Sequence, residues 1–272
     1  MAKTATRTRP QQERICNLVP TPEQKTRTDW RFDDALEAGV LTAQRELPSS
    51  VDLRKAWWTV GDQGNTGSCV GWGSTEGVAR YMMVTYKGLA QKTKLSPRFT
   101  WMACKETDEF RARPETMIES AGTTLKAAAD VLRLYGAVPE TLLPFKVDTA
   151  MYTGSENSFY ATAATLKIAA YFNLQLDLGN WRTWLVQHGP ILVGLNVDKT
   201  WDEATLTGGK LDEFQPNTVR GGHAVAVVGF TDDDRFIVRN SWGTSWGDNG
   251  FAYASEDYIK AAFFNESYGF TV

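Results

Sequence analysis

The chain has 272 residues and a hydrophobic content of 42%. That is enough for one large domain, or for two small lobes that share a cleft, and it argues against a disordered protein. The 29 basic and 32 acidic residues give a net charge of −3, so the charge balance does not indicate nucleic acid or an anionic membrane surface as a partner. No run approaches the roughly 18 apolar residues that a membrane-spanning helix requires.

The first 46 residues differ in composition from the rest of the chain. They are rich in Arg, Thr, Gln and Pro and contain few aliphatic residues before Trp30. Residues 1–14 are predicted to be flexible, and residues 30–43 favour a short helix with Asp29 as its N-cap. We therefore interpret residues 1–46 as an N-terminal leader that precedes a main domain at residues 47–272.

Helical patterns follow in the first half of the main domain. Residues 74–86 place apolar side chains at helical spacing, and Ser96 before Pro97 is typical of the start of a second helix. A third helix is predicted over residues 122–135, with Gly136 as its C-cap. These elements predict a helical lobe over about residues 60–160.

The sequence pattern of the second half predicts mainly strands. A helix over residues 178–188 ends at Gly189-Pro190 and is followed by apolar runs typical of strands. Those runs are residues 191–195, 224–230 and 236–240, and a polar turn at 231–234 joins the last two. The pattern predicts a β-rich lobe over about residues 161–272.

One cysteine lies in a context that favours nucleophilic chemistry. Cys69 ends a glycine-rich turn just before the predicted central helix, where the helix dipole and free N–H groups stabilise a thiolate. Gln63 lies six residues earlier, and its side-chain amide could join the Cys69 N–H in stabilising an oxyanion beside the sulfur. The alternative for Cys69 is an inert buried thiol, and Gln63 could be an ordinary turn residue.

A reactive cysteine needs a base, and the chain has two histidines. His223 lies between Gly222 and Ala224, 17 residues before Asn240, which could orient its ring as the third member of a triad. The alternatives are a structural histidine beside a strand and an ordinary asparagine at a strand end. His188 precedes a helix-ending Gly-Pro pair and is interpreted as structural.

Three segments in this order resemble the active-site motifs of papain-like cysteine proteases. They are Gln63…Gly67-Ser68-Cys69, Gly222-His223-Ala224-Val225, and the run Asn240-Ser241-Trp242-Gly243 that continues to Phe251. The resemblance covers the chain from about Leu47 to the C-terminus. It implies a cathepsin-like peptidase with an α+β, two-lobe fold, in which an active-site cleft separates a helical lobe from a β-barrel-like lobe.

The same resemblance implies roles for individual residues. Cys69 would attack a peptide carbonyl as a thiolate paired with the His223 imidazolium, and a thioester would follow. Asn240 would orient His223, Gln63 would stabilise the oxyanion, and Trp242 would cover the His–Asn hydrogen bond. The disulfides usual in the family are missing, since Thr66 stands where one of their cysteines is expected and only Cys16 and Cys104 remain. Together with the lack of a visible signal peptide, this predicts a cytoplasmic protein.

The substrate-binding residues are also inferred from the resemblance. Gly122, Thr123 and Thr124 would line the non-primed side of the cleft, where a backbone pair binds substrate as an added strand. The main side-chain pocket would be roomy and uncharged, with a preference for apolar or aromatic side chains; its candidates are Leu125, Gly194, Gly222 and Ala224. The alternative is that these residues only pack the lobes together.

The sequence thus predicts a cysteine endopeptidase that is restrained by its leader. No metal-binding pattern is present, and no cofactor is implied. The expected partners are peptide or protein substrates and the chain's own N-terminal segment in the cleft. Two alternatives remain open: a non-catalytic binding protein with the same fold, and an acyl transferase that uses the same thioester.

Overall fold

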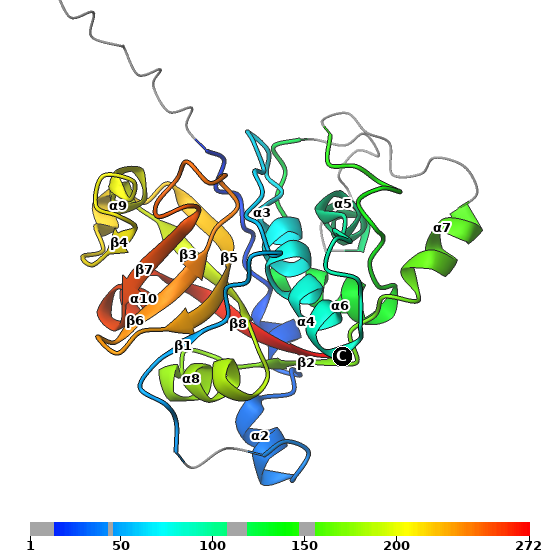
Figure 1. Ribbon diagram of the computed structural model, residues 1–272, viewed down its shortest axis with the longest axis horizontal. Coiled ribbons are helices and arrows are strands. Elements are labelled where there is room, and N and C mark those ends of the chain that lie inside the picture. Colours follow the sequence, from blue (N-terminus) through cyan, green and yellow to red (C-terminus); the bar gives the residue numbers. More distant parts are fainter. Residues whose placement is uncertain (1–13, 43–45, 108–118, 147–155) are drawn as a thin grey trace, which may run out of the picture.

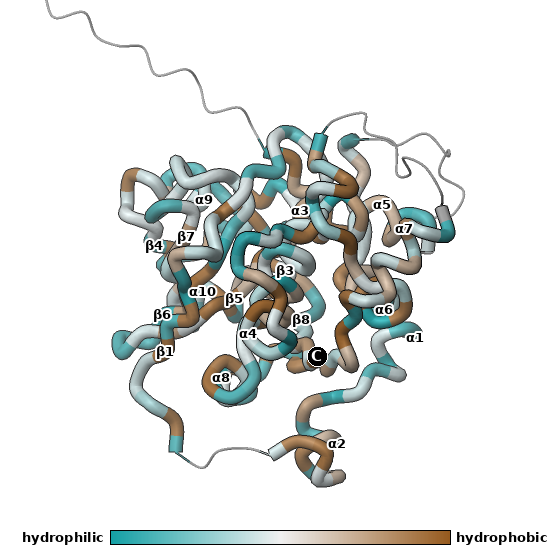
Figure 2. Tube along the Cα trace, turned by 45° about the vertical axis from the view of Figure 1, so that its right-hand side comes forward, coloured by the Kyte–Doolittle hydropathy of each residue, from teal (hydrophilic) through white to brown (hydrophobic). Residues whose placement is uncertain are grey.

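The computed structural model describes residues 14–42, 46–107, 119–146 and 156–272. Figure 1 shows helices on one side, a curved mixed sheet on the other, and the N-terminal leader running between them. The leader contains α1 (Glu23–Thr26) and α2 (Phe32–Glu37). Both views place α2 at the end of the molecule opposite the point where the described chain begins (Figure 2).

A continuous helical stretch forms the centre of the helical half. It begins as α3 (Cys69–Gly71), continues as the π-helical segment η1 (Trp72–Ala79) and ends as α4 (Arg80–Tyr86). Small residues let this stretch lie close to the sheet, since a Cβ added at Gly73 would lie 3.2 Å from Leu192 and one added at Gly77 would lie 3.1 Å from Ala226. This close packing fixes where Cys69, at the first turn, meets the sheet.

Two of the other helices in this half begin at side-chain caps. The Ser96 hydroxyl accepts the Phe99 N–H (3.1 Å) at the start of α5 (Pro97–Thr107). Thr124 accepts the Ala127 N–H (3.0 Å) at the start of α6 (Leu125–Leu134), as expected for an N-cap. Helix α7 spans Glu156–Ala163.

One mixed sheet forms the other half of the described chain. Its order is β2 (Ala170–Asn173), β8 (Phe263–Thr271), β3 (Ile191–Val197), β5 (Gly221–Phe230), β6 (Arg235–Arg239), β7 (Phe251–Ser255) and β4 (Lys210–Leu211), and β1 (Val51–Asp52) also pairs with β5. The β4–β7 pair is parallel and the other pairs are antiparallel. Around the sheet lie α8 (Leu178–Gln187), α9 (Lys199–Glu203), η2 (Pro216–Thr218) and α10 (Glu256–Ala262).

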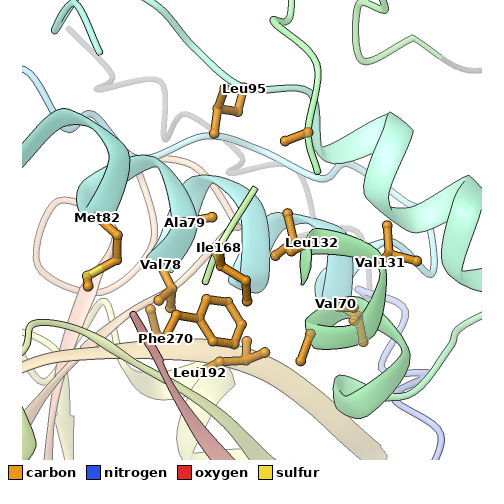
Figure 3. Close-up of a cluster of buried hydrophobic side chains, with 14 of the residues drawn as sticks. Val70, Val78, Ala79, Met82, Leu95, Val131, Leu132, Ile168, Leu192 and Phe270 are labelled. Atoms are coloured by element: carbon orange, nitrogen blue, oxygen red, sulfur yellow. The ribbon is translucent and has the colours of Figure 1, made fainter. Parts of the chain in front are cut away.

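Strand β5 separates two apolar cores because its side chains alternate between the faces of the sheet. Ala224, Ala226 and Val228 join the core against the central helix, while Val225 and Val227 join the core on the opposite face. Figure 3 shows the first core, where Val78 and Met82 of the central helix face Leu192 of β3 and Phe270 of β8. None of the helices in the described ranges is long and apolar enough to cross a membrane.

Two sequence-based predictions for the leader are corrected. The helix predicted over residues 30–43 is only α2, because Gly39 adopts φ +69° and the chain turns there. Asp29 is not its N-cap; its carboxylate is buried in another network, described below, and Arg31 holds the cap position without a side-chain bond. Of residues 1–14, predicted to be flexible, only Arg14 lies among the described residues, and it forms an ion pair with Asp62 (2.7 Å).

Candidate active site

Cys69 begins the central helix at the floor of the site and is fully buried. The turn before it is closed by Thr66, whose hydroxyl donates to the Gln63 carbonyl (2.8 Å) and lies 2.6 Å from the Ser68 hydroxyl. The Gln63 side-chain Nε2 donates back to the Thr66 carbonyl (2.9 Å). All three cysteines are free, so hydrogen bonds of Thr66 hold this turn where a disulfide cysteine was expected from the family resemblance.

His223 and Asn240 are brought together by neighbouring strands. His223 lies on β5, Asn240 follows β6, and His223 Nε2 lies 2.7 Å from Asn240 Oδ1. The Ser241 backbone N–H also donates to that oxygen (2.8 Å), so the oxygen is an acceptor and Nε2 carries the ring proton. The other nitrogen, Nδ1, is buried without a hydrogen-bond partner and is therefore the free base.

Cys69 and His223 belong to the same buried site. The Cys69 sulfur accepts a hydrogen bond from the backbone N–H of Ala224, the residue next to His223. Tryptophans enclose the imidazole: the Trp242 ring lies 4.9 Å from it at 38°, and Trp201 meets it edge-on at 5.6 Å. Water is thereby kept from the His223–Asn240 bond, which strengthens it.

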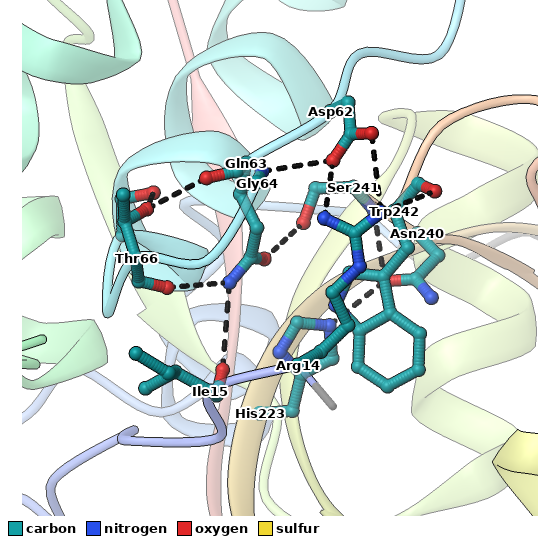
Figure 4. A network of polar contacts seen from close by, with 11 residues as sticks. Arg14, Ile15, Asp62, Gln63, Gly64, Thr66, His223, Asn240, Ser241 and Trp242 are labelled. Atoms are coloured by element: carbon teal, nitrogen blue, oxygen red, sulfur yellow. Dashed lines mark hydrogen bonds and ion pairs between the residues drawn. The ribbon is translucent and has the colours of Figure 1, made fainter. Parts of the chain in front are cut away.

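Ser241 connects this pair to the predicted oxyanion donor. Its hydroxyl donates to Gln63 Oε1 (2.8 Å), and its carbonyl accepts the Gln63 backbone N–H (2.8 Å). Figure 4 shows the resulting chain of contacts from Thr66 through Gln63 and Ser241 to Asn240 and His223. The Gln63 amide therefore has a fixed orientation, with its oxygen toward Ser241 and its nitrogen toward Thr66.

Leader residues 14–19, which we call the strap, lie across this site. The Leu18 N–H donates to the Gly222 carbonyl (2.9 Å) and the Val19 N–H to the Thr123 carbonyl (3.0 Å), so the strap binds the two walls as an added strand does. A Cβ added at Gly122 would lie 1.5 Å from the Asn17 carbonyl oxygen. Glycine is thus required there by the close approach of the strap.

The strap also reaches the predicted chemical groups directly. The Ile15 carbonyl accepts from Gln63 Nε2 (3.5 Å), and the Asn17 backbone N–H donates to the Cys69 sulfur. Arg14 pairs with Asp62 and donates to the Trp242 carbonyl (3.4 Å). Cys69, His223 and Gln63 are all 0% exposed beneath it.

Burial sets the ionisation of the two reactive groups. It raises the pKa of the Cys69 thiol to about 11, and the backbone N–H groups around the sulfur only partly offset this. It lowers the pKa of His223 to about 4, against the hydrogen bond to Asn240 and with smaller contributions from the charges of Arg220 and Arg14. Burial thus favours the neutral forms of both groups, so the expected thiolate–imidazolium pair is disfavoured while the strap covers them.

One of the predicted pocket residues, Gly194, lies against a strap side chain. A Cβ added at Gly194 would lie 2.8 Å from the Leu18 side chain, and Leu18 shares one apolar core with Leu125 and Ala224. Gly222 faces the ring of Phe264, 2.8 Å from an added Cβ. Thr124 is instead used as the N-cap of α6.

Sequence reasoning missed several residues around the site. Ser241 lies inside the quoted Asn-Ser-Trp motif, so its position between two predicted site residues was an available signal. Trp201 and Phe264 come from distant segments with no local signal, and only the fold places them against His223 and Gly222. Within the described ranges, no group of three or more His, Cys, Asp or Glu side chains could hold a metal ion.

Comparison with known proteins finds similar sequences and similar folds. Cathepsin B-like CP2 of Giardia intestinalis is 27% identical over 260 residues, covering 85% of this chain and 79% of its own. The structure superposes on xylellain, a cysteine protease from Xylella fastidiosa, with a TM-score of 0.76, 20% identity and coverage of 95% and 96% of the two chains. It also superposes on digestive procathepsin L2 from Tenebrio molitor larval midgut, with a TM-score of 0.70, 20% identity and coverage of 95% and 78%.

The structural matches confirm the predicted α+β, two-lobe fold. The family model described as papain family cysteine protease matches residues 47–267, which is most of the chain. The chain therefore belongs to the papain family of cysteine proteases.

Proposed function

We propose that this protein is a cysteine endopeptidase with the triad Cys69, His223 and Asn240, and that its strap keeps it inactive. The observation that carries the triad is the 2.7 Å bond between His223 Nε2 and Asn240 Oδ1, which leaves Nδ1 as a free base in the pocket that holds the Cys69 sulfur. Family membership supplies the reaction class, and this bond supports the individual roles.

In the proposed reaction, His223 Nδ1 takes the thiol proton and the Cys69 sulfur attacks the substrate carbonyl carbon. The oxyanion accepts hydrogen bonds from Gln63 Nε2 and the Cys69 N–H, and one such donor is typically worth about 3–4 kcal/mol. The imidazolium gives its proton to the leaving amine, which breaks the C–N bond and leaves a thioester. Water, deprotonated by His223, then hydrolyses the thioester and regenerates the thiol.

The strap opposes each of these steps. It buries Cys69 and His223, so formation of the ion pair is unfavourable, and the Ile15 carbonyl engages the Gln63 amide. From its N-terminal end, the strap runs from Trp242 to Thr123. Because the family resemblance assigns Thr123 to the non-primed side, this direction is opposite to that of a substrate, which explains how the strap could lie over Cys69 without being cut.

The strap also supports a substrate preference. The Leu18 side chain lies 2.8 Å from a Cβ added at Gly194 and shares one apolar core with the other pocket candidates Leu125 and Ala224. We propose that a leucine-sized aliphatic side chain of a substrate occupies the same place once the strap has left.

A pair of leader variants tests both parts of the proposal in the full chain. Leu18→Glu places a charge in the apolar pocket, which forfeits about 1.5–3 kcal/mol of burial and should raise hydrolysis of a leucine-containing fluorogenic peptide about 10- to 100-fold. Val40→Glu changes an exposed leader residue (67% exposed) and should leave the rate at the wild-type level.

The same assay decides the triad. Adding Cys69→Ala or His223→Ala to Leu18→Glu should abolish hydrolysis while the thermal unfolding curve remains cooperative. Retained hydrolysis in either double variant would refute the assignment of that residue. If Leu18→Glu itself cleaves nothing and its Cys69 does not react with an epoxide thiol inhibitor, the protein is a non-catalytic member of the family. Amide products formed with an added amine would instead indicate acyl transfer.

A further inference from the structure

The leader has a second part whose contacts differ in kind from those of the strap. Pro20 is exposed, and beyond it residues 21–37, which we call the anchor, contact a surface outside the active site. This surface is built from β2, β8, α6 and α8. The anchor contributes buried polar and aromatic groups to it.

Asp29 is the most buried charge of the anchor, with a side chain that is 0% exposed. Its carboxylate pairs with Lys126 of α6 and accepts hydrogen bonds from Asn173 Nδ2 (3.0 Å) and the Tyr268 hydroxyl (2.8 Å). A buried carboxylate is tolerable only when it is paired in this way. Removing the anchor would therefore take this carboxylate away from three polar groups of the main domain, and Lys126 and Tyr268 would keep only their contacts with Tyr171 and Glu266.

Anchor residues before and after Asp29 also form hydrogen bonds with the main domain. The Thr21 hydroxyl and backbone N–H donate to Glu266 Oε1 of β8 (2.6 and 3.2 Å), and Glu266 is 1% exposed. The Asn173 backbone N–H donates to the Trp30 carbonyl (2.8 Å), where Arg31 forms a parallel bridge with β2. The anchor thus completes the edge of the sheet.

Helix α2 adds apolar burial. Phe32 is 1% exposed and meets the ring of Trp184 edge-on at 5.5 Å. Asp33 accepts a hydrogen bond from Asn180 Nδ2 (2.9 Å), which ties the helix to α8. Without α2, the aromatic residues Phe172 and Trp184 would lose the cover that buries them.

The strap is held less firmly. Its ion pair joins Arg14 to a half-exposed Asp62, Asn17 is exposed, and its hydrogen bonds to the walls run mainly through backbone groups. Such contacts exchange readily with water or with a substrate backbone. The buried charge network of the anchor does not exchange in this way.

We propose that the surface formed by β2, β8, α6 and α8 is a permanent binding site for the chain's own residues 21–37, and that activation detaches only the strap. The anchor then remains part of the active enzyme even after the chain is cut on its C-terminal side. This inference rests on the proposed function, because it concerns the regulation of the same site.

Two engineered cleavage sites in the full chain test the proposal. The recognition sequence of a site-specific serine protease is inserted either at Pro20 (cut A) or between the exposed residues Pro48 and Ser49 (cut B). Cut B alone should leave peptide hydrolysis at the uncut level, with the leader fragment co-eluting with the catalytic part in native size exclusion. Cut A should raise hydrolysis by about tenfold or more as the strap leaves.

With both cuts, the fragment that carries residues 21–37 should still co-elute. Asp29→Ala should release that fragment, whereas Thr28→Ala, at a neighbouring exposed position, should not. Cut B alone activating as strongly as cut A, or the doubly cut protein losing the fragment, would overturn the proposal. Fragment retention is measured without activity, so inactivity of both cut A and Leu18→Glu would overturn the proposed function instead.

Discussion

Ser241 shows how one residue can position two groups of the site. Its hydroxyl holds the Gln63 amide oxygen and its backbone N–H holds the Asn240 oxygen. Gln63 Nε2 is thereby aimed at the cleft, and Asn240 is fixed as an acceptor for His223. Ser241 acts through these two residues as a positioning residue.

Ser241→Ala should therefore lower kcat with little change in KM. Loss of a whole oxyanion donor costs about 10²–10³ in kcat, so disordering that donor should cost about 10- to 100-fold. The measurement is made in the Leu18→Glu background, where the strap is displaced. Ser245→Ala is the matched control, since Ser245 lies exposed on the same loop; equal kcat values for the two serine variants would contradict the role of Ser241.

The central helix shows which features a sequence pattern can and cannot predict. Helical spacing indicated a start near Ser74, but the helix begins at Cys69. Gly71 and Gly73 disfavour a helix by intrinsic propensity, and they are present because neighbouring elements approach closely: a Cβ at Gly71 would lie 2.4 Å from the Pro97 carbonyl. Tertiary packing decided this boundary, which no local pattern records.

Some residues of the site could likewise be predicted from local sequence, whereas others depend on tertiary structure. Cys69, Gln63, His223 and Asn240 were predicted because each lies in a short motif, and the fold brings them together. The contact of the leader with Gly122 and the burial of Cys69 and His223 were not predictable in detail. They depend on the path of the strap, whose sequence has little local pattern. A polar leader residue such as Asp29 looks the same in sequence whether it faces solvent or a buried lysine.

Helix α2 provides a stability test at the level of one element. Phe32→Ala removes a ring buried against Trp184, and such a change typically costs about 3–5 kcal/mol. The melting temperature should fall by roughly 10 °C. Trp30→Ala, which truncates a ring that is 61% exposed, should change it by much less. Equal, small shifts would show that the anchor contributes little to the stability of the fold.

At the scale of the whole molecule, one chain of hydrogen bonds connects the leader with the main domain. The Tyr268 oxygen lies 2.8 Å from both Asp29 Oδ2 and Glu266 Oε2. One hydroxyl proton cannot be donated to two carboxylates, so both contacts are hydrogen bonds only when one carboxyl is protonated and donates to Tyr268. Asp29 is paired with Lys126, so Glu266 is the carboxyl that takes the proton. Burial is the main cause that raises the pKa of Glu266, and the nearby charge of Asp29 is a smaller one. Hydrogen bonds that Thr21 and Tyr268 can donate to the ionised carboxylate oppose this shift.

Because of this raised pKa, the stability of the folded chain with its leader bound should fall as the pH rises. Glu266 binds its proton more tightly in the folded chain than in the unfolded chain, so its stabilising effect is complete below about pH 4.5, the ordinary value for glutamate, and is lost as the pH rises through the folded pKa. The groups that face it are Thr21 and Tyr268 directly, with Asp29 and its partner Lys126 beyond them. No histidine is among these groups.

Glu266→Gln should remove this pH dependence. The glutamine amide donates to Tyr268 as the protonated acid does, and its oxygen still accepts from Thr21, so the variant keeps the closed geometry at every pH. Melting temperatures are compared between pH 4.5 and pH 8. The variant should match the wild type near pH 4.5 and exceed it increasingly as the pH rises toward the folded pKa of Glu266, because ionising Glu266 forfeits up to about 1.4 kcal/mol per pH unit until that pKa is passed. Glu23→Gln, on the exposed surface of α1, is the control and should track the wild type. A constant difference between Glu266→Gln and wild type across this range would mean that Glu266 does not change its protonation state there, and the anchor would then hold the leader equally well at every pH.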